Sequence, residues 1–249
     1  MASSEDYLIY GRHPILEALK EEKPFEKLLV QKPTTAPELK QIITLANAAG
    51  IPVQFVPLQK LNSITRKNHQ GVIGYASVLT YYLIEDILEK VYADGRTPLF
   101  LILDQITDVR NFGAIARSAE CLGADAIVVP AKGSALLSGD AMKASAGALN
   151  KVPICKVRFL TDAIDFFNLN GIQVYSSDVK GGKPLSQCDF TVPVAVILGS
   201  EEKGVSPSVA AKANARFYIP MIGELDSLNV SVSAGIVLYE VQRQRTIPA

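Results

Sequence analysis

A small set of polar residues in the second half of the chain has types that could position a substrate. Asn111 and Arg117 lie in one stretch, Glu201 follows an apolar run, and Asn229 precedes the last apolar segment. The chain around them is rich in glycine and serine, so backbone amides are available to bind a polar ligand. This combination favours a nucleotide-like ligand held by backbone groups, amides and one guanidinium.

The expected position of Arg117 indicates the charge of its ligand. We expect Asp108 or Asn111 to cap a helix that begins in this stretch. Arg117 is then expected near the amino end of that helix, where the helix dipole disfavours a cation unless an anion lies nearby. The sequence leaves an alternative open, because Arg117 could instead pair with Glu120 or Asp108.

Several other chemistries lack the residues that they need. No G-x-G-x-x-G follows the first strand of either predicted domain, and neither a P-loop nor a G-x-S-x-G elbow is present. The chain has two histidines, and its three cysteines, Cys121, Cys155 and Cys188, are far apart. We therefore expect no metal and no disulfide, and we interpret the cysteines as buried free thiols.

The elements that must position the polar set are two short strands and a helix. Residues 194–198 form a continuous apolar run that stops at Gly199, as expected of a buried parallel strand that ends in a loop. A second strand, 217–219, leads through the loop 221–227 into the final helix. Ligands of open α/β sheets bind at such strand ends, so the loops are expected to converge on one pocket.

The 249 residues predict two domains, 1–77 and 97–249, joined by a linker at 78–96. Both alternate strands with helices, so we expect α/β folds, with a mostly parallel sheet covered on both faces in the larger domain. One of its helices is predicted around 140–148. Composition is typical of soluble proteins, and no apolar run is long enough to span a membrane, so we expect a cytoplasmic protein.

The net charge of the chain does not indicate which kind of partner it binds. The 25 basic and 25 acidic side chains give a net charge of zero, which can conceal a local basic face. Polar and basic residues gather before the last strand of the first domain, and they could contact an RNA backbone or simply form a solvated loop. They are Lys60, Arg66, Lys67, Asn68, His69 and Gln70.

Three stretches together resemble the motifs of the SpoU (TrmH-like) RNA ribose 2′-O-methyltransferases. They read Asp104-x-x-x-Asp108-x-x-Asn111-x-Gly113-x-x-x-Arg117, Leu198-Gly199-Ser200-Glu201-x-x-Gly204, and Ile219-Pro220-Met221 through Ser227-Leu228-Asn229-Val230-Ser231-Val232-Ser233. Val109 stands where many members have proline, which removes no functional group. Tyr10-Gly11-x-His13 and His69-Gln70-Gly71-Val72 resemble the substrate-binding domain of the RlmB type.

The resemblance implies a SPOUT fold whose C-terminal part forms a deep trefoil knot, preceded by a small α/β, ribosomal-protein-like RNA-binding domain. It also implies a homodimer and an S-adenosylmethionine pocket in the knot. Backbone groups at Gly199, Ile219 and Leu228 are expected to hold the cofactor. Met221 and Ser227 complete the expected pocket. Without the family, Ile219, Met221 and Leu228 would be interpreted as core, and Ser227 and Ser231 equally well as helix caps.

The same resemblance implies roles for the polar set. Arg117 matches the family's essential arginine, and we expect it to fix the substrate phosphate, because a guanidinium is a reluctant base. Glu201 is expected to orient Arg117, while Asn111 and Asn229 hold the ribose and the loop. The proton acceptor stays open between Arg117, the phosphate and water.

The predicted function is S-adenosylmethionine-dependent 2′-O-methylation of RNA, without a metal, at a guanosine of large-subunit ribosomal RNA. The alternatives are a transfer RNA or resistance-type methyltransferase and a non-catalytic RNA-binding relative. The apolar final helix could form the dimer contact or belong to the core of one chain.

Overall fold

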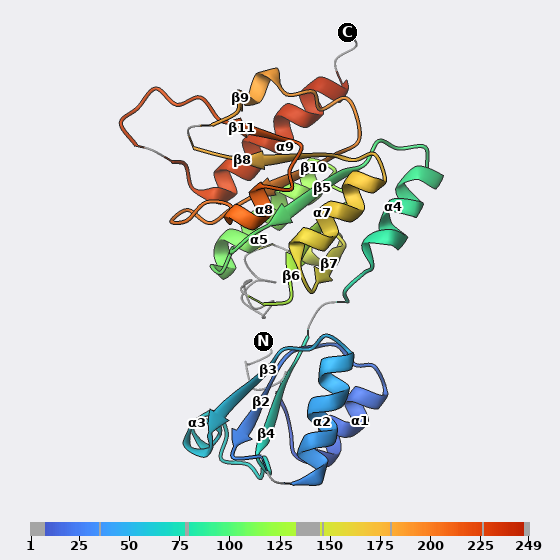
Figure 1. Ribbon diagram of the computed structural model, residues 1–249, viewed down its shortest axis with the longest axis vertical. Coiled ribbons are helices and arrows are strands. Elements are labelled where there is room, and N and C mark those ends of the chain that lie inside the picture. Colours follow the sequence, from blue (N-terminus) through green and yellow to red (C-terminus); the bar gives the residue numbers. More distant parts are fainter. Residues whose placement is uncertain are drawn as a thin grey trace. The chain divides into compact units, whose positions relative to one another are not determined.

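The computed structural model describes residues 8–34, 36–77, 80–132, 145, 147–179, 181–225 and 227–246. These residues form two compact units that divide between Thr80 and Tyr81, shown in blue and in green to red in Figure 1. The helix predicted around 140–148 falls almost entirely outside the described residues. Among the helices that are described, none is long and apolar enough to cross a membrane.

The N-terminal unit is a mixed four-stranded sheet with the strand order β1-β4-β2-β3. Helices α1 and α2 cover one face and bury the larger apolar cluster, which includes Ile15, Leu39 and Val30. The short helix α3 covers part of the other face through Leu61. The elements are β1 (Leu8–Tyr10), α1 (Arg12–Lys20), β2 (Phe25–Lys32), α2 (Pro37–Ala48), β3 (Val53–Pro57), α3 (Leu58–Ile64) and β4 (Val72–Ala76).

The second unit is built on a parallel seven-stranded sheet with the order β7-β6-β5-β10-β8-β11-β9. Its strands are β5 (Leu99–Leu103), β6 (Ala126–Pro130), β7 (Ile154–Val157), β8 (Gln173–Ser177), β9 (Lys183–Pro184), β10 (Val194–Leu198) and β11 (Ala215–Tyr218). Strands β5 and β10 are buried at every position, so both faces of the central sheet must be covered.

Helices cover the two faces of this sheet as layers (Figure 1). Helices α4 (Ile84–Ala93), α7 (Leu160–Leu169) and α8 (Pro207–Ala210) bury their apolar side chains in one cluster with alternate residues of the strands. Helices α5 (Val109–Cys121) and α9 (Val230–Thr246) pack against each other on the opposite face. The predicted doubly covered parallel sheet is confirmed.

The segment expected as a linker is mostly part of the second unit. Helix α4 buries Ile84, Ile87, Leu88 and Val91 in that unit's core. Burial of four such side chains contributes about 6–12 kcal/mol of transfer free energy, which a free linker would not gain. The expected linker at 78–96 therefore requires correction, since the unit begins at Tyr81.

Candidate active site

The first and second motif loops are tied together by a buried carboxylate. Asp104 follows β5 and is 6% exposed. Its Oδ2 accepts a hydrogen bond of 2.7 Å from the backbone N–H of Ser206, in the loop after β10. Because β5 and β10 are parallel neighbours, both loops leave the same edge of the sheet, and Asp104 fixes the distance between them. The sequence motif included Asp104 without assigning it a role.

Glu201 gathers residues from three distant parts of the chain into one polar cluster. Its Oε1 accepts hydrogen bonds from the side-chain amides of Asn111 at 3.0 Å and Asn229 at 2.6 Å. Asn229 also donates to Oδ1 of Asn111 at 3.0 Å, which closes the ring. We call Asn111, Glu201 and Asn229 the amide–carboxylate cluster.

The cluster lies at the amino end of α9, where a negative charge is stabilised. The backbone N–H of Val230 donates to Glu201 Oε1 at 3.3 Å. Oδ1 of Asn229 accepts from the backbone N–H of Ser231 at 2.9 Å and from its hydroxyl at 2.5 Å. Asn229 therefore caps the helix, and Ser231 is one of its donors rather than the cap. The helix dipole and the first free N–H groups both favour the carboxylate of Glu201 in this place.

Helix α5 begins at a carboxylate cap. Oδ1 of Asp108 accepts from the backbone N–H groups of Arg110 at 2.8 Å and Asn111 at 2.9 Å. These bonds, first of all the one from Asn111, lower the pKa of Asp108. Of the two caps that the sequence allowed, the structure thus has Asp108, which leaves the amide of Asn111 free to join the cluster.

The position of Arg117 differs most from what the sequence predicted. It lies eight residues after the start of the 13-residue helix α5, in its second half, so the argument from an unfavourable dipole was wrong. The alternative pairing is absent too, since Glu120 binds Lys151 and Asp108 binds Arg110.

Glu201 does not orient Arg117 in this structure. The exposed Arg117 makes no hydrogen bond or ion pair with any described residue, so its charge is available to a ligand. Asn111 and Arg117 are six residues apart on α5, which corresponds to about 9 Å along the helix and a rotation of roughly one and two-thirds turns. Arg117 therefore faces a different direction from Asn111.

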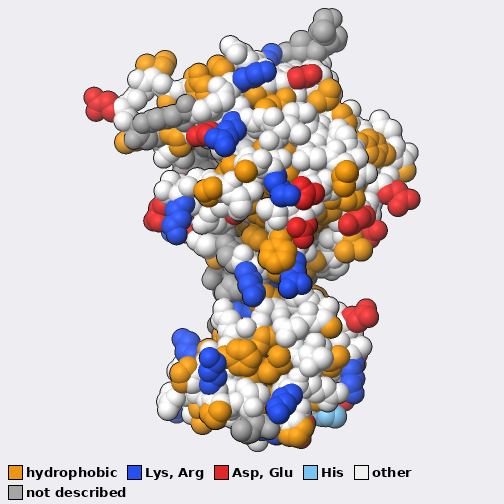
Figure 2. All heavy atoms as spheres, viewed as in Figure 1, with side chains coloured by type: hydrophobic (Ala, Val, Ile, Leu, Met, Phe, Trp, Pro, Cys, Tyr) orange, Lys and Arg blue, Asp and Glu red, His pale blue; other side chains and the backbone are white. Residues whose placement is uncertain are grey.

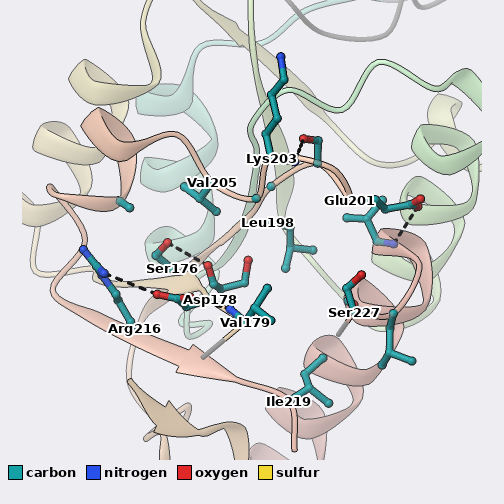
Figure 3. A pocket seen from close by; sticks show the side chains of 18 of the residues that line it. Ser176, Asp178, Val179, Leu198, Glu201, Lys203, Val205, Arg216, Ile219 and Ser227 are labelled. Carbon is teal, nitrogen blue, oxygen red and sulfur yellow. Dashed lines mark hydrogen bonds and ion pairs between the residues drawn. The ribbon is translucent and has the colours of Figure 1, made fainter. Parts of the chain in front are cut away.

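A cavity of about 480 Å³ opens beside the amide–carboxylate cluster. Figure 3 shows Glu201 at one end, with Ile219 and Ser227 projecting toward the space from below and Lys203 pointing away from it. All five residues expected to bind a cofactor line this cavity. They are Gly199, Ile219, Met221, Ser227 and Leu228. The expected convergence of the strand-end loops is confirmed, and a second hollow of about 370 Å³ lies on the other side of the loop at 200–203.

The cavity also has a charged end that the sequence analysis missed. Asp178 and Arg216 form an ion pair of 3.5 Å, opposite Glu201 in Figure 3. Ser176, buried at the end of β8, lines the same end. The signal was present, because Ser176, Ser177 and Asp178 are polar residues at the carboxyl end of a buried strand.

Metal ligands do not gather near this site. No group of three or more His, Cys, Asp or Glu side chains with metal-binding geometry occurs in the described part of the chain. All three cysteines are free, but Cys121 is exposed, so the expectation of three buried thiols was wrong for it. Burial raises the pKa of Cys155 to about 12 and also raises that of Cys188.

In the N-terminal unit, the predicted polar group splits into structural and exposed members. His69 is buried, and its Nδ1 accepts a hydrogen bond of 3.1 Å from the backbone N–H of Gly71. Its Nε2 must then carry the proton and donate to Asn62 at 2.9 Å. Gln70 accepts from the backbone of Arg12 at 3.0 Å. These residues fix the loop, whereas the exposed lysines and arginine remain candidates for contact with a partner.

The comparisons with known proteins agree with this geometry. Residues 98–239 match the SpoU rRNA Methylase family, and residues 8–82 match a domain described as RNA 2′-O ribose methyltransferase substrate binding. The putative TrmH family tRNA/rRNA methyltransferase YacO of Bacillus subtilis (strain 168) is 34% identical over 245 residues, which cover 98% of each chain.

Two solved structures have a similar fold. The AdoMet-bound rRNA methyltransferase from Sinorhizobium meliloti is 26% identical, with a TM-score of 0.60 over 95% of this chain and 87% of that chain. The TrmH/SpoU tRNA modifying enzyme of A. aeolicus is 29% identical, with a TM-score of 0.56 over 65% of this chain and 85% of that one. With both domains matched and a relative aligned along nearly its whole length, the chain belongs to the SpoU rRNA methylase family and carries that family's substrate-binding domain.

Proposed function

We propose that this protein transfers the methyl group of S-adenosylmethionine to the 2′-hydroxyl of a ribose in RNA. The observation that carries the proposal is the amide–carboxylate cluster, which joins three motif segments at the mouth of the 480 Å³ cavity. A bound relative supports the choice of cofactor, since the S. meliloti structure is named as AdoMet-bound.

The cavity suits this cofactor in size and chemistry. Its volume lies in the range of small-molecule sites, and its lining combines apolar side chains with backbone groups. Ile219 and Leu228 would hold the flat base, and the backbone near Gly199 would bind polar edges. When bound, the sulfonium supplies an activated methyl group, so no metal is needed.

The chain's own residues then have to position the ribose and assist loss of a weakly acidic proton. Asn111 and Asn229 each present an amide that Glu201 holds in a fixed orientation, which lowers the entropy cost of binding the sugar. Arg117, which has no described protein partner, binds the phosphate beside the reacting ribose. Its charge stabilises the oxygen as the proton leaves for that phosphate or for water, while Arg117 itself could accept the proton only in its neutral form.

For the substrate we propose ribosomal RNA, with a guanosine of the large-subunit RNA as the target. The S. meliloti rRNA methyltransferase matches 95% of this chain, while the A. aeolicus tRNA modifying enzyme matches 65%, a share close to that of the second unit alone. The N-terminal unit thus accompanies the relative named for ribosomal RNA. Transfer RNA is the competing outcome, because YacO is named for both.

We also propose that the protein acts in the cytoplasm as a homodimer whose C-terminal part is knotted. Helix α9 buries Val237 and Val241 within its own chain, so of the two alternatives for this helix these residues belong to the core. Val232 and Tyr239, seven residues apart on one face, are 50% and 62% exposed. A second copy of the chain would cover them. Light scattering of the protein as it elutes from a size-exclusion column gives its mass and so shows whether it is a dimer.

The proposed chemistry is tested by mapping methylated riboses. The purified protein is incubated with S-adenosylmethionine and ribosomal RNA that lacks the modification, and the 2′-O-methyl group is located by primer extension. We expect Arg117→Ala to lower the rate by at least about 100-fold without changing cofactor affinity, as for loss of a group that stabilises transition-state charge. Lys90→Ala, an exposed cation on α4, should leave the rate unchanged. An unaltered rate in the Arg117 variant would refute the assigned role.

A further inference from the structure

Charge in the N-terminal unit is segregated between the two faces of its sheet. Residues 1–80 carry nine basic and seven acidic side chains, although the whole chain is neutral. Glu5 and Asp6 lie outside the described residues, and the described acidic ones are Glu17, Glu21, Glu22, Glu26 and Glu38. All but Glu26 belong to α1, to the turn after it or to α2, and Glu26 is buried and accepts a hydrogen bond of 2.6 Å from Ser77.

On the helical face the cations lie among four of these carboxylates. Arg12 contacts Glu38 at 3.4 Å and Lys23 contacts Glu21 at 2.8 Å, whereas Lys20, Lys32 and Lys40 form no ion pair with a described residue. On the opposite face, Lys27 has no ion pair with a described carboxylate, and it lies close enough to Lys60 for the two positive charges to interact. Burial and the charge of Lys60 lower the pKa of Lys27. Two neighbouring cations with no described carboxylate paired to them would be stabilised by a bound phosphate.

Two tyrosines lie among these cations on the same face. Tyr75 of β4 pairs with Lys27 of β2 and with Leu8 of β1, while Tyr10 of β1 pairs with Ile73 of β4. Tyr10 and Tyr75 are therefore diagonal neighbours on adjacent antiparallel strands, about 7–8 Å apart. Both are partly exposed, and both pack at the edge of the cluster under α3.

A lysine lies over each tyrosine ring. Lys27 Nζ is 4.9 Å from the centre of the Tyr75 ring, and Lys67 Nζ is 5.3 Å from that of Tyr10. We call Tyr10, Tyr75, Lys27, Lys60 and Lys67 the tyrosine–lysine face. Figure 2 shows one side of the N-terminal unit, where Lys and Arg side chains lie among hydrophobic groups.

We propose that the tyrosine–lysine face binds single-stranded RNA, with bases stacked on Tyr10 and Tyr75 and phosphates bound by Lys27, Lys60 and Lys67. Bases of single-stranded RNA can stack on exposed aromatic rings while nearby cations bind the phosphates. Bases inside a duplex are enclosed and cannot stack in this way. This inference rests on the proposed RNA substrate and specifies which form of it the N-terminal unit holds. Duplex RNA would leave the rings unused.

The chain contains a matched control on the other face. Phe55 is 45% exposed and has Lys32 Nζ 5.6 Å from its ring centre, so it repeats the same aromatic and cationic pair. Phe55 pairs with Val30, which belongs to the core under α1 and α2. Alternation along the strand places Phe55 on that helical face, away from the two tyrosines.

The test measures binding of the full-length protein to a fluorescein-labelled, unstructured ten-nucleotide RNA and to its duplex. We expect tighter binding of the single strand, and an affinity about 5- to 150-fold weaker in Tyr10→Leu and Tyr75→Leu, as for loss of one stacked base. Phe55→Leu should stay within about twofold of the natural protein. The proposal is overturned by preference for the duplex, by equal losses in all three variants, or by no loss in any.

A second measurement does not depend on the folding of the tyrosine variants. Lys60 is exposed on α3, and Lys60→Gln should make the slope of log affinity against log salt less steep by about 0.7, while Lys40→Gln on α2 should not. Equal slopes for the two variants would count against the face. Cofactor titration separates the hypotheses. If the protein methylates ribosomal RNA but binds no single strand, only this inference fails, whereas absence of cofactor binding refutes the proposed function alone.

Discussion

Replacement of Gly199 by alanine should disable the proposed cofactor cavity while leaving the sheet intact. A Cβ at this position would lie 2.1 Å from the backbone carbon of Gly204 and 2.2 Å from the nitrogen of Val205. Real Cβ atoms are essentially never found within 3.0 Å of a heavy atom outside their own residue and its two chain neighbours. Because the obstacles are backbone atoms, no side chain can rotate away, and the loop must retreat by at least about 0.9 Å.

This displacement exceeds what the loop can absorb. The next residue, Ser206, is held to the buried carboxylate of Asp104 by a hydrogen bond of 2.7 Å, which a movement of that size would stretch past the usual limit. The forced shift costs about 1–3 kcal/mol, as for other overpacked sites. If the cofactor binds only when the loop holds its native position, this cost lowers cofactor affinity by about 5- to 150-fold.

Calorimetric titration of S-adenosylmethionine into each purified variant measures the effect. Gly223→Ala is the matched control, since its Cβ would meet nothing within 4 Å and it belongs to a loop next to the cavity. We expect the control to bind as the natural protein does, and both variants to show the same circular dichroism spectrum. Affinity of Gly199→Ala within about twofold of the natural protein would refute the assignment of the cavity.

Three further substitutions or reactions test the surrounding structure. Asn229→Ala removes the cap of α9 and should lower the free energy of unfolding by about 1 kcal/mol in urea titration; an unchanged midpoint would contradict the cap. Arg245 donates to four backbone carbonyls, which a lysine cannot reach together, so Arg245→Lys should cost about 2–4 kcal/mol in the same assay. Arg243 binds one carboxylate near the surface, so Arg243→Lys should lower the free energy of unfolding much less. Equal decreases in the two variants would contradict the role of the four carbonyl contacts of Arg245. At pH 8 a maleimide should label Cys121 in the native protein but Cys155, whose pKa burial raises to about 12, only after unfolding; equal labelling rates by mass spectrometry would contradict this.

The sequence by itself determined the α/β class, the two-domain division and most element positions. Continuous apolar runs such as Val194–Leu198 are buried on both sides, and this requirement is visible in the residues themselves. It also indicated which strand ends carry the candidate site, because Gly199 and the polar residues after it cannot continue a buried strand. The five expected cofactor residues and Asn111, Glu201 and Asn229 were all named from motifs whose loops the structure brings together.

Only the tertiary structure decided how those residues are connected. Glu201 binds two amides and a helix start instead of Arg117, a choice that depends on distances between segments 28 and 90 residues away along the chain. The ion pair of Asp178 and Arg216 depends on the crossover that places β8 beside β11.

The sequence alone also could not show which side chains meet on the surface of each unit. Local patterns showed that α4 is amphipathic and that lysines precede β4, but not which core receives the helix or which rings the lysines cover. A single chain position carries residue type and short-range periodicity, whereas pairing across a sheet or between helices is set by the packing of the whole domain. In the N-terminal unit, that packing places most of the described carboxylates on the helical face and the tyrosines with three lysines on the other.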